Sequence, residues 1–141
     1  MTTQVFITGM HQIPPQLKKD RRLQCHVIDN PYNLRDQLDA HSGEKIIIAF
    51  LPFLEMRHFD IYNYLQKKHR DVKTFFVIDE LSSAMKIRLK SREDFVVLWK
   101  TEVHNLNRDI HAHLDGKKLE LRQDKRENHD NRALVSPSLL P

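Results

Sequence analysis

The chain has 141 residues, a formal net charge of +4, and 40% hydrophobic and 30% charged residues, which is typical of one folded domain rather than two. No apolar run approaches the ~18 residues that a membrane helix needs, and no basic segment precedes the first apolar run, so we expect a cytoplasmic protein without membrane contact. Acidic residues interrupt or flank the basic groups, and no aromatic residues are interleaved with them, which argues against nucleic acid as a partner.

Five short apolar runs recur along the chain and indicate strands. They are rich in β-branched and aromatic residues and are too short to be helices. They span residues 4–9, 24–29, 45–50, 72–79 and 94–99. The third run is followed by Pro52, which predicts a turn there.

The segments between these runs carry helix signals. The first of them allows only a short helix after Pro14-Pro15, and the second has Asn30 as a cap before Pro31. Further helices are predicted at residues 60–68 and 81–90. For the last of these, the pair Asp79-Glu80 is predicted to provide the N-cap, with a general base or a cation ligand as the alternative function of the pair.

The last predicted helix has the clearest pattern. Thr101 can cap it, Gly116 can end it, and apolar residues recur at helical spacing between them. Alternating strands and helices predict an α/β domain over residues 1–116, with a doubly wound, five-stranded parallel sheet of flavodoxin-like type. Residues 117–141 are dense in charged and amide side chains, and we expect a flexible linker or tail.

Two segments resemble the receiver domain of bacterial response regulators. One is "DFVVLW" followed by Lys100, where a receiver carries a lysine at the end of its fifth strand. The other is "LPFLEMRHFDIYNYL", which is similar to the leucine-proline turn and helix after the third strand of a receiver. The resemblance covers most of residues 4–115 by pattern and implies a place in two-component signal transduction.

The residues that a receiver needs for phosphoryl transfer are missing. The position of its acceptor aspartate falls among Ile48, Ala49 and Phe50. The pair of acids that holds Mg²⁺ at the end of the first strand is replaced by Thr8, Gly9 and Met10, which offer no carboxylate oxygen. Ile78 or Asp79 replaces the hydroxyl residue after the fourth strand, and Thr101 replaces the proline after the lysine. The chain therefore resembles a degenerate receiver, or pseudo-receiver, and we expect no enzymatic activity.

Other chemistry is weakly supported. The single cysteine, Cys25, lies in a predicted strand and is expected to be packed and inert, with its neighbour His26 on the opposite face. Among the nine histidines, His104, His111 and His113 share the last helix, but their spacing does not suit a metal pair. No glycine-rich phosphate loop is present, which argues against nucleotide binding of that kind. We expect neither a metal nor a cofactor.

Two functions remain. The first is a phosphorylation-independent module that binds a protein partner or output domain, or forms a homodimer. The surface expected to do this carries five residues from the fourth helix to the last helix. They are Met85, Lys86, Lys90, Trp99 and His104.

The second function is a flavodoxin-like domain that binds a small anion or nucleotide with Lys100, Thr8 and the loops at the strand ends. An open electropositive cleft at Lys100 would favour the ligand. A cleft filled by Met10 and by Phe50 or Phe53 would favour the protein interaction. Lys100 is otherwise expected to be a structural cation facing Asp79 or Asp29.

Overall fold

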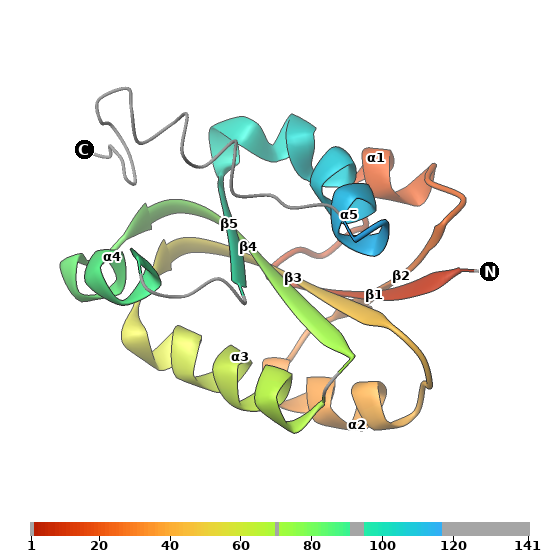
Figure 1. The fold of residues 1–141 in the computed structure, drawn as a ribbon, viewed down its shortest axis with the longest axis horizontal. Coiled ribbons are helices and arrows are strands. Elements are labelled where there is room, and N and C mark those ends of the chain that lie inside the picture. The colour runs from red at the N-terminus through yellow and green to blue at the C-terminus, as the bar shows by residue number, and fades with distance from the viewer. Residues whose placement is uncertain (1, 70, 91–94, 117–141) are drawn as a thin grey trace. The chain divides into compact units, whose positions relative to one another are not determined.

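The computed structural model describes residues 2–69, 71–90 and 95–116, except for the side chain of Lys90. The chain divides into two units, Met1–Val103 and His104–Pro141. The first unit holds the sheet and four α-helices (Figure 1). The predicted tail, residues 117–141, lies outside the described residues.

All five predicted strands are present and form one sheet in the order β2-β1-β3-β4-β5. Every neighbouring pair is parallel, which confirms the predicted flavodoxin-like α/β class. The strands are β1 (Thr3–Thr8), β2 (Leu23–Ile28), β3 (Lys45–Leu54), β4 (Val72–Leu81) and β5 (Phe95–Trp99).

The helices follow the predicted alternation with the strands. In the first unit, α2 and α3 cover one face of the sheet and α1 lies on the other face (Figure 1). The α-helices of that unit are α1 (Pro15–Lys18), α2 (Leu34–Asp39), α3 (Met56–Lys68) and α4 (Ser83–Lys90). Short 3₁₀ helices span Pro31–Asn33 and Lys100–Asn105, and α5 (Leu106–Leu114) belongs to the second unit. Every helix in the described part of the chain is too short or too polar to cross a membrane.

Strands β3 and β4 are longer than predicted. The turn predicted at Pro52 is wrong, because β3 continues through this residue to Leu54. Proline lacks the N–H group that a central ladder requires, but β1 ends opposite Ala49, so β3 has a free edge from Phe50 onward. Pro52 has no partner in the register with β4, and its missing N–H therefore costs no ladder hydrogen bond.

Three predicted helix starts are also wrong. Helix α3 begins at Met56 rather than at residue 60. Asp79 and Glu80 belong to β4 rather than to a cap, and Ser82 caps α4 by accepting a hydrogen bond from the Met85 backbone N–H at 3.2 Å. Thr101 does not cap an α-helix, because it lies within the 3₁₀ helix that precedes α5. The predicted cap at Asn30 is confirmed: its Oδ1 accepts from the Tyr32 N–H at 3.0 Å.

Both faces of the sheet are buried, as parallel sheets require. On one face, side chains from α2, α3 and α4 join the strand residues in a single core that includes Phe6, Phe59 and Phe76. On the other face, the strand residues are also buried. They include Val5, Ile7, Ile46, Ile48, Phe75 and Val77.

Candidate functional site at the carboxyl edge of the sheet

The position predicted to correspond to the acceptor of a receiver lies deep in the molecule. Ile48 and Ala49 are fully buried and Phe50 is half-buried. In the register, Ala49 lies opposite Thr8, so the ends of β3 and β1 meet side by side as they would in a phosphorylation site. No carboxylate occupies either position, and neither Ile48 nor Ala49 is accessible to a substrate.

A buried pair of hydroxyl groups closes the end of β1. The Thr8 Oγ1 lies 2.7 Å from the Tyr62 Oη, which projects from α3. Thr8 and Tyr62 are each only 2% exposed. Burial raises the pKa of Tyr62, and the hydrogen bond with Thr8 opposes that rise. Sequence patterns do not reveal this pair, because its members are 54 residues apart. The one available signal is that Tyr62 lies on the core-facing side of a predicted helix.

The chain that leaves β1 passes directly against the backbone of β3. Gly9 has a φ of +85°, and a Cβ added there would lie 2.0 Å from the Phe50 carbonyl oxygen. Only glycine fits such an approach. Met10 and Phe53 are 37% and 39% exposed, so they do not fill this site. Tyr62 and the Gly9–Phe50 contact close it instead.

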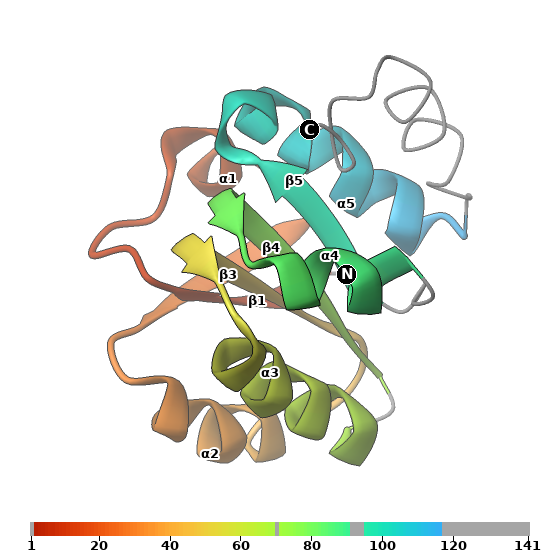
Figure 2. The ribbon, with the colours of Figure 1, turned by 90° about the vertical axis from the view of Figure 1, so that its left-hand side faces the viewer.

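Beyond this closed end, β3 and β4 continue as a two-stranded extension. We call the exposed residues of this segment, Pro52, Phe53, Asp79 and Glu80, the extension rim. Strand side chains normally alternate between faces, but here the pairs packed on the core, Leu51/Ile78 and Leu54/Leu81, are three residues apart. The four rim residues lie between these pairs, and Figure 2 shows the ends of both strands beside α4.

Lys100 lies at the start of the 3₁₀ helix that follows β5 and is exposed. Within the described residues, no hydrogen bond or ion pair joins it to Asp79 or to Asp29, which were its predicted partners. All three side chains are exposed. The resemblance to a receiver at this position therefore rests on sequence alone.

The surface predicted for protein interaction is divided by the structure. Met85 does not belong to it, because this residue is fully buried in the core shared by α3 and α4. Lys86 is exposed, and Trp99 is half-buried and packs against the same core. The side chain of Lys90 lies outside the described residues. His104 is exposed and belongs to the second unit.

Cys25 is held in a half-buried position on β2. Its Sγ lies 4.0 Å from the Leu17 carbonyl oxygen of α1, whereas His26 stacks on Phe6 on the opposite face. The predicted alternation of Cys25 and His26 is thus confirmed. Burial, with a smaller contribution from Asp20, raises the pKa of the Cys25 thiol to about 11. A thiol with such a pKa is a poor nucleophile near neutral pH.

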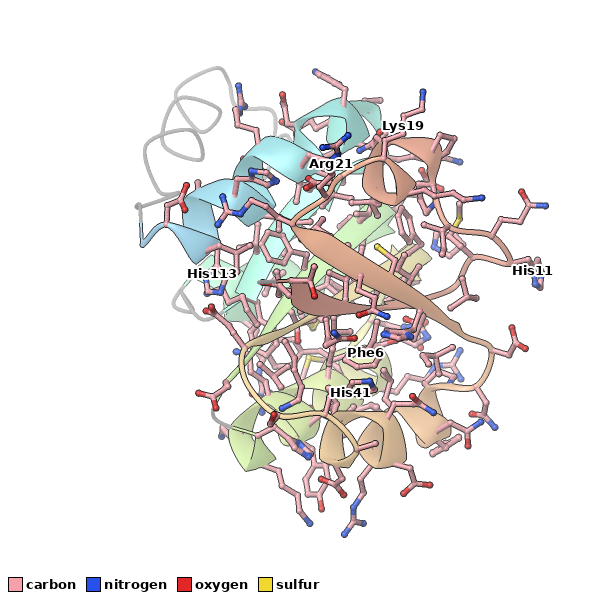
Figure 3. The ribbon with its side chains drawn as sticks, turned by 90° about the vertical axis from the view of Figure 1, so that its right-hand side faces the viewer. Phe6, His11, Lys19, Arg21, His41 and His113 are labelled. Atoms are coloured by element: carbon pink, nitrogen blue, oxygen red, sulfur yellow. The ribbon has the colours of Figure 1, made fainter. Side chains whose placement is uncertain are left out.

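Histidines cluster at the outer strand of the sheet. The ring of His41 lies 5.5 Å from that of Phe6 and 5.2 Å from that of His26 (Figure 3). Burial, and then the nearby His41, lower the pKa of His26. In the described ranges, no group of three or more His, Cys, Asp or Glu side chains could hold a metal ion. His26 on β2 and His41, which follows α2, thus pack on one another and on Phe6.

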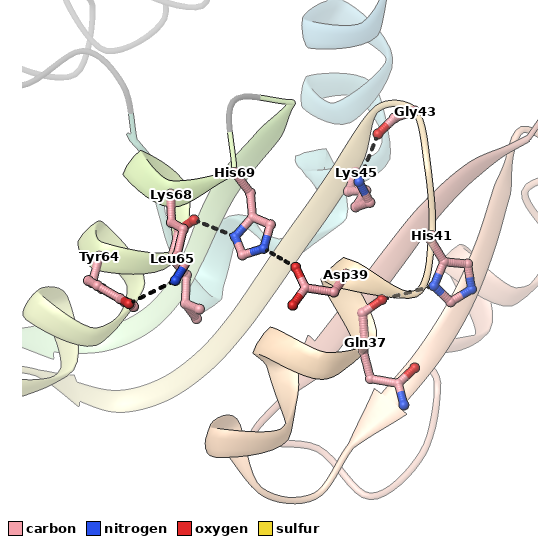
Figure 4. Close-up of polar contacts among 9 residues, drawn as sticks. All are labelled: Gln37, Asp39, His41, Gly43, Lys45, Tyr64, Leu65, Lys68 and His69. Atoms are coloured by element: carbon pink, nitrogen blue, oxygen red, sulfur yellow. Dashed lines mark hydrogen bonds and ion pairs between the residues drawn. The ribbon is translucent and has the colours of Figure 1, made fainter.

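His69 joins the ends of two helices at the opposite edge of the sheet (Figure 4). Its Nδ1 lies 3.0 Å from the Leu65 carbonyl oxygen, and its Nε2 lies 2.8 Å from the Asp39 Oδ1. Both partners are oxygen atoms that can accept a hydrogen bond. The hydrogen bond from His69 lowers the pKa of Asp39 below its ordinary value of 3.8. This contact connects α3 to α2 and is far from the carboxyl ends of the strands.

Comparison with known proteins places the chain in no family. No protein-family model, no curated protein and no solved structure matches the sequence or the fold.

Proposed function

We propose that this chain is a receiver-like signalling module that cannot be phosphorylated and that acts by protein–protein interaction or by dimerisation. It would regulate an output that is attached to it or separate from it. The main support is the closed end of β1 and β3. Thr8 and Tyr62 form a buried hydroxyl pair where a metal site would be needed, and Ala49 occupies the place of an acceptor.

Phosphoryl transfer requires a positioned nucleophile and a metal that neutralises the developing charge. The first requirement is not met at Ile48, Ala49 or Phe50, which carry no nucleophilic side chain. The second is not met at Thr8, Gly9 or Met10, because Mg²⁺ binds mainly to carboxylate oxygens and water. Lys100 alone cannot replace either group, so a signal would have to act through binding.

The alternative is a ligand-binding flavodoxin-like domain that uses Lys100 and Thr8. An accessible Lys100 favours this alternative, since an exposed ammonium group can bind an anion. Thr8 argues against it, because its hydroxyl is buried and already bonded to Tyr62. The protein-interaction module is therefore the better supported function.

The test exposes the purified chain to acetyl phosphate and Mg²⁺ and measures its intact mass. We expect no gain of a phosphoryl group, while a competent receiver treated in parallel becomes modified. A stoichiometric phosphoryl adduct on an Asp or Glu would refute the proposal.

A second arm of the same test titrates inorganic phosphate and ADP into isotope-labelled protein. Saturable chemical-shift changes at Lys100 that are lost in Lys100→Met would favour the ligand-binding alternative. We expect only weak, non-saturating changes, because the Thr8 hydroxyl is not available to a ligand.

A further inference from the structure

The extension rim and the outer side of α4 together form a surface with exposed apolar side chains. Phe53 on the rim is 39% exposed, and Ile87 on α4 is 75% exposed. Soluble proteins expose single apolar residues commonly, but these two lie on adjoining elements, because α4 follows the residue that is hydrogen-bonded to the end of β3. Exposed apolar side chains on adjoining elements are typical of a site of contact.

The orientation of α4 explains the exposure of Ile87. Met85 points into the core and is fully buried. Successive residues of an α-helix are rotated by about 100°, so Ile87 lies about 200° from Met85 and faces away from the core. Lys86 lies between these directions and is also exposed.

The helix is attached directly to the extension. The Ser82 N–H donates to the Leu54 carbonyl oxygen at 3.1 Å, and the Lys86 N–H donates to the Ser82 carbonyl oxygen at 3.1 Å. Leu54, Leu81 and Met85 belong to the same core. The rim and α4 therefore form one continuous piece of surface, and both views show them side by side (Figures 1 and 2).

The charges on this surface complement one another. The rim contributes two carboxylates, Asp79 and Glu80, whereas the sequence of α4 contains no acid and contributes Lys86. Within the part of the chain that the structure describes, none of these three side chains forms a hydrogen bond or an ion pair. All three side chains are exposed.

We propose that the rim and α4 form the interface of a two-fold homodimer. In this dimer, Glu80 of one copy faces Lys86 of the second copy, and Phe53 and Ile87 lie between these charge pairs. A two-fold axis places residue i against residue j and residue j against residue i, so a dimer interface of this kind must be complementary to itself. The rim and α4 meet that requirement because one copy carries both signs of charge beside exposed apolar side chains.

This inference rests on the proposed function as a protein-interaction module. The partner that it names is a second copy of the same chain. The experiment measures mass by light scattering at increasing protein concentration for the wild type, Glu80→Lys, Lys86→Glu and an equimolar mixture of the two variants. We expect a concentration-dependent dimer for the wild type. Each variant alone should have a dissociation constant raised roughly tenfold or more, because like charges then face each other across the axis.

The mixture gives the decisive result. A heterodimer of Glu80→Lys with Lys86→Glu pairs two lysines with two glutamates, so we expect the mixture to recover the dimer that each variant has lost. Ile87→Gln should weaken the dimer without changing the charge. Asp71→Lys and Lys67→Glu are matched controls, because both residues are exposed and neither lies on the rim or α4; we expect both to dimerise like the wild type.

Three outcomes would overturn the inference. They are a wild type that stays monomeric at high micromolar concentration, variants that dimerise as the wild type does, and a mixture that remains monomeric when both variants are monomeric. Unfolding curves for the two charge variants establish that they are folded. A monomeric wild type would leave the proposed function intact, because that proposal is refuted by a phosphoryl adduct and not by the absence of a dimer.

Discussion

The carboxyl edge of the sheet has two regions of opposite character. At the end of β1, the Thr8 hydroxyl is buried and hydrogen-bonded to the Tyr62 hydroxyl. The backbone of Gly9 lies directly against the backbone of Phe50. A few residues further along β3 and β4, the extension rim exposes an aromatic ring and two carboxylates. The region where a receiver would do its chemistry is thus part of the core, and the surface open to contact lies on the adjacent strands.

The largest expected effect comes from Gly9→Ala. The new Cβ would clash with the Phe50 carbonyl oxygen at 2.0 Å. The alanine would also have to adopt a φ of +85°, which side chains disfavour. We expect a loss of about 3 kcal/mol or more in the free energy of unfolding, since the backbone penalty costs about 1–2 kcal/mol and the overpacking about 1–3 kcal/mol. Urea denaturation measures it.

Gly43→Ala is the matched control for this prediction. Gly43 has nearly the same φ, +84°, but a Cβ there would meet nothing within 4 Å. The free energy of unfolding of this variant should therefore fall only by the backbone penalty of about 1–2 kcal/mol. Equal losses for the two variants would mean that the close approach at Gly9 contributes nothing to stability.

A smaller effect is expected at the hydroxyl pair. Thr8→Val or Tyr62→Phe each leaves one buried hydroxyl without its partner, which costs about 1–3 kcal/mol. The double variant leaves no orphaned group, so its loss should be clearly less than the sum of the single losses. Additive losses in this cycle would show that the pair does not act as a unit.

The smallest effect is expected on the extension rim. Phe53→Ser removes a ring that is 39% exposed and does not belong to the buried core, so we expect the stability of the monomer to change by about 0.5 kcal/mol or less. Measurement at low protein concentration separates this from any effect on a dimer. If the free energy of unfolding fell as much as in Tyr62→Phe, Phe53 would contribute to stability as the closed end does, and the contrast between the two regions would be wrong.

Much of this architecture was predictable, because the strands carry continuous apolar runs that local sequence reveals. The errors occur where contacts between segments distant in the sequence determine the local conformation. Pro52 predicts a turn in isolation, yet it is accommodated in β3 because no strand pairs with that edge. Asp79 and Glu80 have side chains that could cap a helix, but the pairing of this segment with β3 keeps them in a strand. Ser82 caps α4 instead.

For the candidate site, the sequence predicts only the absence of the acceptor aspartate and of the metal-binding acids of a receiver. The sequence shows no carboxylate at the predicted strand ends, neither at Thr8 to Met10 nor at Ile48 to Phe50. The group that closes the site comes from α3, and its contact with Thr8 spans 54 residues of sequence. Likewise, the burial of Met85 and the exposure of Ile87 depend on how α4 is rotated about its axis, which its weakly patterned sequence does not determine.

Pro52 also bears on aggregation. A strand that projects beyond its neighbours presents unpaired backbone groups, and these can recruit a strand from another molecule. On the free edge of β3, Pro52 has no N–H to donate, and the Phe50 carbonyl oxygen is covered by Gly9. This edge is therefore a poor template for strand addition. Two copies that meet at the extension can associate through side chains, which allows a closed pair and disfavours an open fibre.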